Sequence, residues 1–269
     1  MSYHPLASVH PDARIGKNVT IEPFATIAQD VEIGDGTWIG PNAVIFDGAR
    51  IGKECKIFPG AVISGVPQDL KFKGEKTTAE IGDRTTVREC VTLNRGTIDK
   101  YKTVIGSDCL IMAYAHIGHD CIIGNSCILG NTVQLAGHVT IDDYAIFGGA
   151  CAVQQFSKVG AHAYIGGGSL VRKDVPPYTK AAREPLTYAG VNAVGLSRRG
   201  FSTEKINEIQ EIYRFIFMKS LNNSKAVDLI EKEMPESKER NYILEFIRTS
   251  DQGIMKGFSS ASPSSSSVE

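Results

Sequence analysis

Aliphatic residues recur at every sixth position along most of the chain. Steps of six through positions 9–63, 81–93 and 105–171 give 25 positions, and 24 of them hold Ile, Val or Leu. The next residue is often glycine, and the fifth position of each unit is small or apolar. This hexapeptide pattern is typical of a parallel β-helix, in which three units form one triangular coil. We expect the branched residues to point inward and the glycines to permit an unusual corner backbone.

Two interruptions of the repeat keep its phase. The step from Ile63 to Ile81 equals three hexapeptides, and the step from Leu93 to Ile105 equals two. Because both steps are whole multiples of the repeat, the coil is expected to continue past two outward loops. The first loop carries the polar segment 67–76. Loops that project from a rigid scaffold are frequent sites of function.

The period changes near the C-terminal end of the chain. Pro176 and Pro177 cannot continue a hydrogen-bonded ladder, and apolar residues over 202–252 follow a helical period of 3.6. Ser202 is a candidate N-cap, and further short helices are expected around 226–234 and 242–247. The expected domains are a β-helix over 1–178, a connecting segment over 179–201, an α-helical C-terminal domain over 202–256 and a disordered, serine-rich tail over 257–269.

Composition excludes several classes of partner. The 29 Lys and Arg nearly balance the 30 Asp and Glu, so no basic field for nucleic acid is expected. The N-terminus lacks a secretory signal pattern. The uncharged stretch 121–141 is too rich in polar residues to span a membrane. We therefore expect a cytoplasmic protein without membrane insertion.

Cysteine usage indicates packing rather than chemistry. The chain has six cysteines. Five of them occupy the small fifth position of a hexapeptide: Cys55, Cys109, Cys121, Cys127 and Cys151. A compact buried thiol suits that position, and no C-x-x-C pair is present. No structural metal or disulfide is expected.

The coil period predicts which polar residues are neighbours. Gly137 is expected one coil above His119, and His138 is expected above Asp120, because the members of each pair are three hexapeptides apart. His119 is third in its hexapeptide, so its imidazole is expected to point outward and to be exposed. Asp120 is placed to orient it. With His116, these residues converge on one edge of two adjacent coils, and Gln155 follows one coil higher.

This arrangement fits acyl transfer. Histidine acts as a general base near neutral pH. A backbone N–H of a glycine one coil away could stabilise a developing oxyanion. No serine or cysteine nucleophile is needed when the substrate provides its own hydroxyl. The residues therefore favour direct transfer of an acyl group from a thioester to an alcohol.

Several segments together resemble one family closely. The similarity covers about residues 5–255 and is carried by 68–71 (QDLK), 115–121 (AHIGHDC), 135–139 (LAGHV), 174–178 (DVPPY) and 191–201 (VNAVGLSRRGF). They resemble the acyl-carrier-protein–UDP-N-acetylglucosamine O-acyltransferases of lipid A biosynthesis. Hexapeptides alone are shared by many acyltransferases, whereas the QDLK loop, the H-x-x-H-D string and the R-R-G-F entry into the helices are specific in combination.

The resemblance implies a fold, a reaction and an assembly. The fold is an all-β left-handed parallel β-helix of hexapeptide repeats, followed by a small α-helical C-terminal domain. The reaction transfers a long-chain (R)-3-hydroxyacyl group from acyl carrier protein to the 3-hydroxyl of UDP-N-acetylglucosamine, the first step of lipid A biosynthesis, without a cofactor or metal. The assembly is a homotrimer with active sites between subunits.

The resemblance also implies residue roles. His119 would be the general base, Asp120 its partner and the Gly137 N–H the oxyanion donor. Substrate contacts would come from the QDLK loop, the histidine edge and the R-R-G-F entry: Gln68, Asp69, Lys71, His116, His138, Gln155, Asn192, Arg198 and Arg199. Gly167 would act as an acyl-length ruler that leaves the groove open for donors of myristoyl class or longer. The alternative, a glycine required by a tight corner, stays open.

Departures from the family pattern and competing functions also remain. Gln154 stands where a histidine is expected, Val194 where many members have glutamate, and 183–185 (REP) replace a more usual Gly-Asn stretch. An N-acyltransferase of the same pathway would normally carry an extra N-terminal uridine-binding domain. A γ-carbonic-anhydrase-like enzyme would hold zinc with three histidines. A non-catalytic scaffold would not need the His-Asp/Gly column. Whether the acceptor bears a 3-hydroxyl or a 3-amino group stays undecided.

Overall fold

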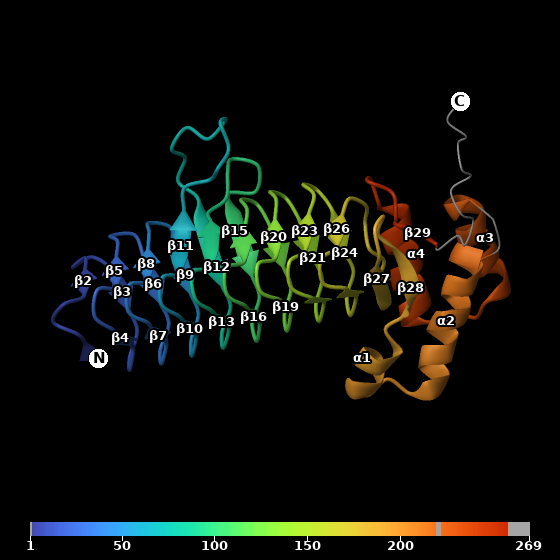
Figure 1. Ribbon diagram of the computed structural model, residues 1–269, viewed down its shortest axis with the longest axis horizontal. Helices are drawn as coiled ribbons and strands as arrows, with labels where there is room; N and C mark the ends of the chain where they lie inside the picture. Colours follow the sequence, from blue (N-terminus) through green and yellow to red (C-terminus); the bar gives the residue numbers. More distant parts are fainter. Residues whose placement is uncertain (1, 219–221, 258–269) are drawn as a thin grey trace, which may run out of the picture.

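The chain forms a long triangular prism with helices at one end (Figure 1). The computed structural model describes residues 2–218 and 222–257. Three sheets run along the prism, and within the coils each strand pairs in parallel with the strand one coil away. The order of the strands confirms the expected parallel β-helix of three-strand coils.

Most strands are only two residues long, and the second residue is the buried guide aliphatic. The first sheet contains β1 (Ser2–Tyr3), β4 (Thr20–Ile21), β7 (Trp38–Ile39), β10 (Lys56–Ile57), β13 (Thr86–Val87), β16 (Leu110–Ile111), β19 (Ile128–Leu129), β22 (Ile146–Phe147), β25 (Tyr164–Ile165), β27 (Thr179–Ala182), β28 (Thr187–Val191) and β29 (Lys256–Gly257). The second sheet contains β2 (Ser8–Val9), β5 (Thr26–Ile27), β8 (Val44–Ile45), β11 (Val62–Gly65), β14 (Thr92–Asn94), β17 (His116–Ile117), β20 (Gln134–Leu135), β23 (Ala152–Val153) and β26 (Leu170–Val171). The third sheet contains β3 (Arg14–Ile15), β6 (Glu32–Ile33), β9 (Ala49–Ile51), β12 (Thr78–Ile81), β15 (Lys102–Ile105), β18 (Ile122–Ile123), β21 (Thr140–Ile141) and β24 (Lys158–Val159).

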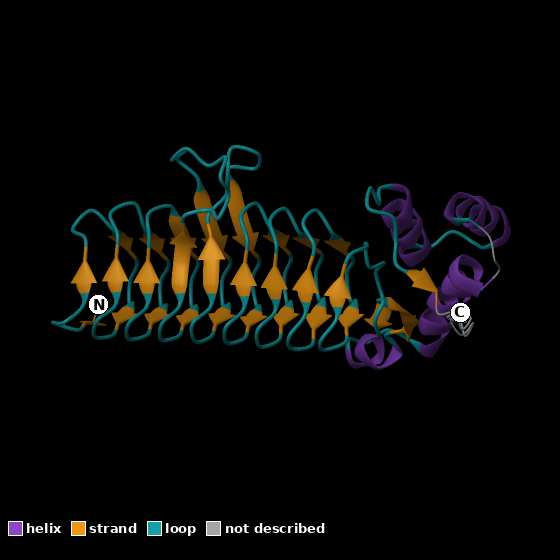
Figure 2. Cartoon of the chain, turned by 45° about the horizontal axis from the view of Figure 1, so that its top comes forward, coloured by secondary structure: helices purple, strands orange, loops and turns teal. Residues whose placement is uncertain are grey.

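Both interruptions of the repeat leave the prism at the same corner. We call the turns that lead from a second-sheet strand to the next third-sheet strand the catalytic corner. The loop 66–77 joins β11 to β12 there, and the loop 95–101 joins β14 to β15 one coil later. The two loops rise together from one edge of the prism (Figure 2). The phase of the repeat resumes after each loop, as expected, with Ile81 paired to Ile51 and Ile105 paired to Ile81.

The glycines that follow the guide residues have a different role from the one expected. They are absent from the residues with positive φ, which are mostly two positions further along and mostly not glycine, such as Asp120 at φ 59°. The glycines instead allow adjacent coils to approach. A Cβ on Gly118 would lie 2.9 Å from the backbone C of Ala136 and the N of Gly137. Close packing between coils, rather than backbone freedom, therefore selects glycine here.

The prism extends beyond the expected boundary at residue 178. β27 pairs in parallel with β25, Ala181 is fully buried in the prism core, and β28 then pairs antiparallel with β27. Ile165 pairs with Ala181, a step two residues short of three hexapeptides. The six-residue phase could not reveal this strand. The segment 179–201 is thus a hairpin and a short helix, α1 (Ala193–Arg198), rather than a plain connector.

The C-terminal helices form a second core against the end of the prism. They are α2 (Thr203–Met218), α3 (Asn223–Glu233) and α4 (Lys238–Arg248). The Ser202 hydroxyl accepts a hydrogen bond from the Lys205 N–H at 3.3 Å, as expected of an N-cap. Tyr213 is fully buried, and its hydroxyl donates to the Pro177 carbonyl at 2.5 Å. This bond ties α2 to the last coil.

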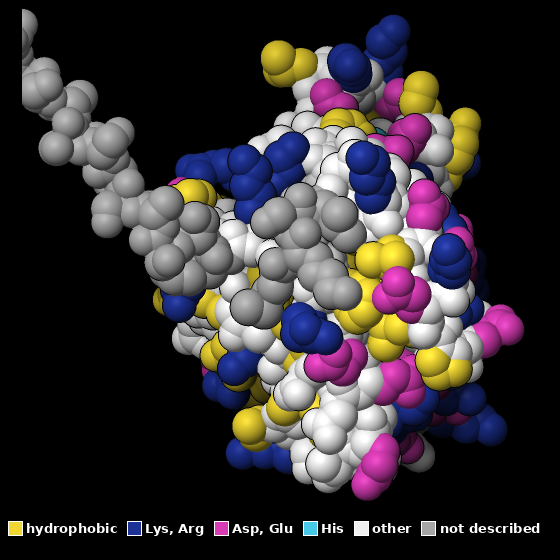
Figure 3. Space-filling model, turned by 90° about the vertical axis from the view of Figure 1, so that its right-hand side faces the viewer, with side chains coloured by type: hydrophobic (Ala, Val, Ile, Leu, Met, Phe, Trp, Pro, Cys, Tyr) yellow, Lys and Arg dark blue, Asp and Glu magenta, His cyan; other side chains and the backbone are white. Residues whose placement is uncertain are grey.

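The surface and the ends of the chain add three observations. The end face with the helices carries side chains of both charges with hydrophobic side chains between them (Figure 3). Within the described part of the chain, no helix has the length and apolar character of a membrane span. Gly257 belongs to β29, whereas the rest of the expected tail, 258–269, lies outside the described residues.

Candidate active site

The catalytic corner brings the expected catalytic residues together. His119 and Asp120 lie in the turn after β17, and Gly137 and His138 lie in the turn after β20. The His138 N–H donates to the His119 carbonyl at 2.9 Å, which confirms that the two turns are stacked. The loops 66–77 and 95–101 leave the same corner in the two coils below. Four consecutive turns of one corner therefore surround the expected catalytic residues.

The imidazole of His119 is more enclosed than the repeat indicated. It points outward from the coil, as expected, but His119 is only 8% exposed and Asp120 is 0% exposed. The loop 95–101 folds back over this corner and excludes solvent, an effect that the six-residue pattern does not encode. His119 Nδ1 lies 2.8 Å from Asp120 Oδ2. An ionised carboxylate only accepts hydrogen bonds, so the proton resides on Nδ1 and Nε2 is the free base.

Asp120 remains ionised despite its burial. Burial alone would raise the pKa of its carboxyl, but hydrogen bonds from Thr97, His119 and the Lys100 N–H more than compensate, and the pKa lies below its ordinary value. A charged acceptor therefore faces His119 across the physiological pH range. It holds one tautomer of the imidazole and stabilises its protonated form.

Gly137 lies directly against the imidazole. A Cβ at this position would be 2.6 Å from His119 Cε1 and 2.7 Å from His119 Nε2. Any side chain on residue 137 would therefore collide with the free ring nitrogen. Glycine leaves that nitrogen open to a substrate.

The other two histidines of this edge differ in environment. His138 Nδ1 is 3.2 Å from Asp99 Oδ2, and its Nε2 is 3.7 Å from Asp120 Oδ2. Its ring stacks on Phe156 with centroids 4.7 Å apart. His116 Nδ1 shares a hydrogen bond of 2.7 Å with the Thr92 hydroxyl. Burial and the neighbouring His119 lower the pKa of His116, which favours its neutral form.

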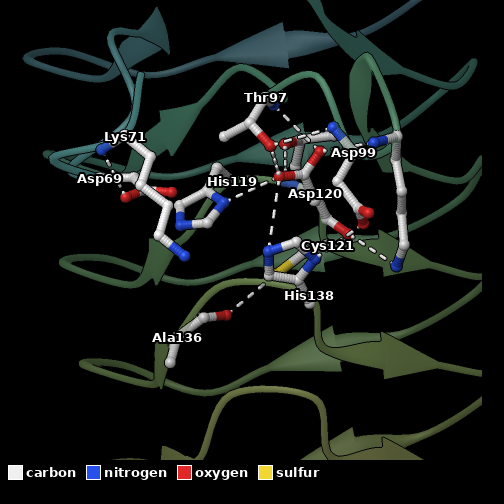
Figure 4. A network of polar contacts seen from close by, with 11 residues as sticks. Asp69, Lys71, Thr97, Asp99, His119, Asp120, Cys121, Ala136 and His138 are labelled. Atoms are coloured by element: carbon white, nitrogen blue, oxygen red, sulfur yellow. Dashed lines mark hydrogen bonds and ion pairs between the residues drawn. The ribbon is translucent and has the colours of Figure 1, made fainter.

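A pocket of about 300 Å³ opens beside His138, and neither His119 nor His116 belongs to its lining. Its lining comes from both loops and from the two coils above: Asp69, Lys71, Phe72, Glu75, Thr97, Ile98, Asp99, His138, Gln155 and Phe156. In Figure 4, Asp69 and Lys71 lie across the His119 imidazole from Asp120. The Lys71 N–H donates to Asp69 Oδ1 at 2.9 Å and shapes this turn of the loop. Gln68, an expected substrate contact, is exposed and does not line the pocket.

Three expected substrate contacts lie at a different corner of the prism. We call the turns that lead from a third-sheet strand to the next first-sheet strand the opposite corner. Arg199 covers the Tyr144 ring there, with its guanidinium carbon 4.3 Å from the ring centroid. Asn192 caps α1 by accepting from the Gly195 N–H at 3.3 Å and donates to the His162 carbonyl at 3.0 Å.

Arg198, in the last turn of α1, is exposed. Neither it nor Asn192 or Arg199 lines the pocket beside His138. Burial and the charge of Arg199 lower the pKa of His162 to about 4, so this corner presents a neutral imidazole and a guanidinium. A single chain does not bring these residues to His119.

Gly167 lies at the third corner, between the first and second sheets. Gly149 is one coil below it, as expected, and a Cβ on Gly167 would be 3.2 Å from the Gly149 carbonyl oxygen. The left-handed residue of this turn is Gly168, at φ +73°, and not Gly167. The backbone of the corner therefore does not require glycine at 167.

Among the residues that the structure describes, one group of side chains could hold a metal ion. Ligand atoms of His119, Asp120 and His138 lie within 4.8 Å of one another. His116, which the zinc-enzyme alternative would require as a third histidine ligand, is not part of this group. The Asp120 oxygens already accept hydrogen bonds from Thr97, Lys100 and His119. The donor set therefore differs from a three-histidine zinc site.

Sequence reasoning missed the contribution of the loop 95–101. Thr97, Asp99 and Lys100 each contact Asp120 or His138. The available signal was the two-hexapeptide step from Leu93 to Ile105, which places an insertion at the catalytic corner one coil below His119. The spacing located the loop but could not show which of its groups turn inward.

Comparisons with known proteins agree with this architecture. A family model described as "Udp N-acetylglucosamine O-acyltransferase; Domain 2" matches residues 174–255. A second, described as "Bacterial transferase hexapeptide (six repeats)", matches residues 30–65 and 102–137. Together they cover the helical end and parts of the prism.

Curated relatives and solved structures extend the similarity. The chain is 41% identical over 193 residues to the acyl-[acyl-carrier-protein]–UDP-N-acetylglucosamine O-acyltransferase of Anaeromyxobacter sp. strain K, covering 71% of this chain and 75% of that one. The protein of the same description from Burkholderia mallei strain SAVP1 is 39% identical over 199 residues, covering 72% and 76%. The solved UDP-N-acetylglucosamine acyltransferase of Bacteroides fragilis superposes with a TM-score of 0.93 at 50% identity, covering 94% of this chain and 99% of that one.

Proposed function

The chain belongs to the family of acyl-[acyl-carrier-protein]–UDP-N-acetylglucosamine O-acyltransferases and is an acyltransferase, and from this premise we propose that His119 carries out direct general-base acyl transfer. The donor is a long-chain (R)-3-hydroxyacyl thioester of acyl carrier protein, and the acceptor is the 3-hydroxyl of UDP-N-acetylglucosamine. The product is the ester that begins lipid A biosynthesis. The observation that carries this proposal is the 2.8 Å contact between His119 Nδ1 and Asp120, which leaves Nε2 free beside Gly137.

The reaction uses no covalent enzyme intermediate. His119 Nε2 takes the proton of the sugar hydroxyl as its oxygen attacks the thioester carbonyl carbon. The Gly137 N–H donates to the carbonyl oxygen as it becomes negative. The C–S bond then breaks, and the imidazolium returns its proton to the departing thiolate. Asp120 stabilises the imidazolium throughout. The described pocket lining contains neither serine nor cysteine, which agrees with direct transfer.

Residues on the two loops and the upper coils would bind the substrates. Lys71 offers a positive charge and Asp69 an acceptor, and both line the pocket together with Gln155 and His138. Asn192, Arg198 and Arg199 would contact the UDP portion, where guanidinium groups suit phosphate oxygens.

These two sets of residues meet only if a second copy of the chain packs alongside, and the family assembly that the sequence resembles is a homotrimer. The outer surface supports such packing. Leu110, Ile128 and Ile146 form a partly exposed apolar row on the first sheet, and Val104 with Ile122 forms another on the third sheet. Both rows flank the opposite corner, and burying them would stabilise an assembly by the hydrophobic effect. We therefore assign the opposite corner of one subunit to the catalytic corner of its neighbour.

The zinc-enzyme and scaffold alternatives have less support. The clustered metal-ligating groups are two histidines and a hydrogen-bonded aspartate, not three histidines. A scaffold would need neither a buried ionised Asp120 nor a glycine opposite His119. The choice between a hydroxyl and an amino acceptor rests on assays with both sugar nucleotides.

The first prediction concerns the base. His119→Ala should lower the rate of ester formation from 3-hydroxyacyl carrier protein and UDP-N-acetylglucosamine by about 10²–10⁴-fold, the usual cost of losing a general base. Product is measured by mass spectrometry, with the 3-amino analogue of the acceptor run in parallel. His10→Ala, at an exposed histidine of the first coil, is the matched control and should keep wild-type activity. A His119→Ala protein that keeps more than about a tenth of the wild-type rate would show that the base is another group.

The second prediction concerns assembly. Light scattering should give a mass of three 29.1 kDa chains, because the catalytic and opposite corners of one chain cannot form a common site. Leu110→Lys together with Ile128→Lys should weaken the trimer and the activity in parallel, whereas Lys56→Glu on the same sheet should affect neither. A stable, fully active monomer would refute the shared site.

The third prediction concerns chain length. Gly167→Met should favour 3-hydroxyacyl donors several carbons shorter than the wild-type enzyme does, because the side chain would obstruct the proposed acyl groove. The ratio of kcat/KM for short over long donors should rise about tenfold or more. The melting temperature should change little, since only the Gly149 carbonyl must yield. Equal losses on short and long donors would instead assign Gly167 a purely structural role.

A further inference from the structure

The loop 95–101 is connected to the proposed base by one buried carboxylate. The loop adds six residues to the regular repeat and lies one coil below the turn that contains His119. Its residue Thr97 directs polar groups onto Asp120 (Figure 4), and the Lys100 N–H donates to the same carboxylate. Asp120 makes no contact with solvent, so the surrounding donors alone determine its orientation.

Each oxygen of the Asp120 carboxylate accepts from its own set of donors. Oδ1 accepts the Thr97 N–H at 3.0 Å and the Lys100 N–H at 3.2 Å. Oδ2 accepts the Thr97 hydroxyl at 2.7 Å and lies 2.8 Å from His119 Nδ1. Thr97 thus contacts both oxygens, and its hydroxyl shares one of them with the imidazole. Thr97 itself is 8% exposed.

The loop is held firmly enough to position what it contacts. The Arg95 N–H donates to the Gly65 carbonyl at 2.9 Å, and the Gly96 N–H donates to the Thr78 carbonyl at 3.1 Å. A Cβ on Gly96 would lie 2.3 Å from the Lys102 N, so only glycine allows the two ends of the loop to approach. The Tyr101 N–H closes the loop by donating to the Thr97 carbonyl at 2.8 Å.

We propose that Thr97 is a positioning residue for acyl transfer, which it serves by holding the Asp120 carboxylate in the plane that orients His119. Without the hydroxyl, Oδ2 loses a charge-assisted hydrogen bond and keeps only its contact with His119, so rotation of the carboxylate about its terminal torsion is less restricted. The imidazole that it orients then points less often at the acceptor hydroxyl. This inference rests on the proposed role of His119 as base. Thr97 acts through Asp120 and need not touch substrate.

Thr103 offers a matched control. It is also a buried threonine whose hydroxyl contacts Asp120, but it accepts the Asp120 backbone N–H at 2.8 Å and does not reach the carboxylate. Thr103→Val is the same substitution as Thr97→Val and also removes a buried threonine hydroxyl. It should lower the melting temperature, because a buried N–H loses its acceptor, yet leave kcat near the wild-type value.

The test compares steady-state kinetics of the full-length protein. Thr97→Val should lower kcat about ten- to thirtyfold, the cost of one charge-assisted hydrogen bond, with KM for both substrates within about twofold of wild type. Thr97→Ser, which keeps the hydroxyl, should restore most of the rate. Thr97→Cys has a weaker donor, so its kcat should lie between those of the Val and Ser variants. It replaces Thr97→Val in the comparison if the Val variant does not fold.

A double-mutant comparison shows whether Thr97 acts through His119. In single-turnover assays, Thr97→Val should cause no further loss in a His119→Ala protein, because the group it positions is gone. An equal loss in both backgrounds would overturn the inference, as would a wild-type kcat for Thr97→Val or a rise in KM alone. If His119→Ala is itself active, the proposed base is wrong. If His119→Ala is inactive and Thr97→Val is normal, only the role of Thr97 is wrong.

Discussion

The coil of three hexapeptides is the constraint on which the rest of the structure depends. Each guide aliphatic is buried against those of the coils above and below, so no coil can slip without exposing its apolar side chains. The fixed register converts distance along the sequence into position along an edge. For this reason, His119 and Gly137, which are one full coil apart in the sequence, lie so close that a Cβ on Gly137 would be 2.6 Å from the His119 ring.

The repeat explains where the loops are as well as where the histidines are. Insertions that are multiples of six residues leave every later guide residue buried, so the prism tolerates them at its corners. Both insertions occur at the catalytic corner, directly below His119. There they perform different tasks. The loop 66–77 places Asp69 and Lys71 in the pocket, and the loop 95–101 surrounds Asp120 with donors.

The sequence was sufficient for features that follow from periodicity. The fold, the pairing of His119 with Gly137 and of Asp120 with His138, and the N-cap at Ser202 could all be predicted. The burial of His119 could not, because it depends on how a loop folds back. The strand β27 was missed because its coil is two residues shorter than the repeat and contains two prolines. The reason for the guide-following glycines was also mistaken, since contact between coils is a tertiary property.

Direct transfer is the central claim of this account, and detection of an acyl-enzyme tests it most directly. The protein is incubated with 3-hydroxyacyl carrier protein alone, quenched in acid and analysed by intact mass spectrometry. In the proposed mechanism, His119 assisted by Asp120 activates the acceptor hydroxyl and forms no bond to the acyl carbon. The account therefore predicts an unmodified mass of 29.1 kDa for each chain, with ester appearing only after UDP-N-acetylglucosamine is added. A chain that carries one 3-hydroxyacyl group, and that releases it to the sugar nucleotide at the rate of turnover, would contradict it.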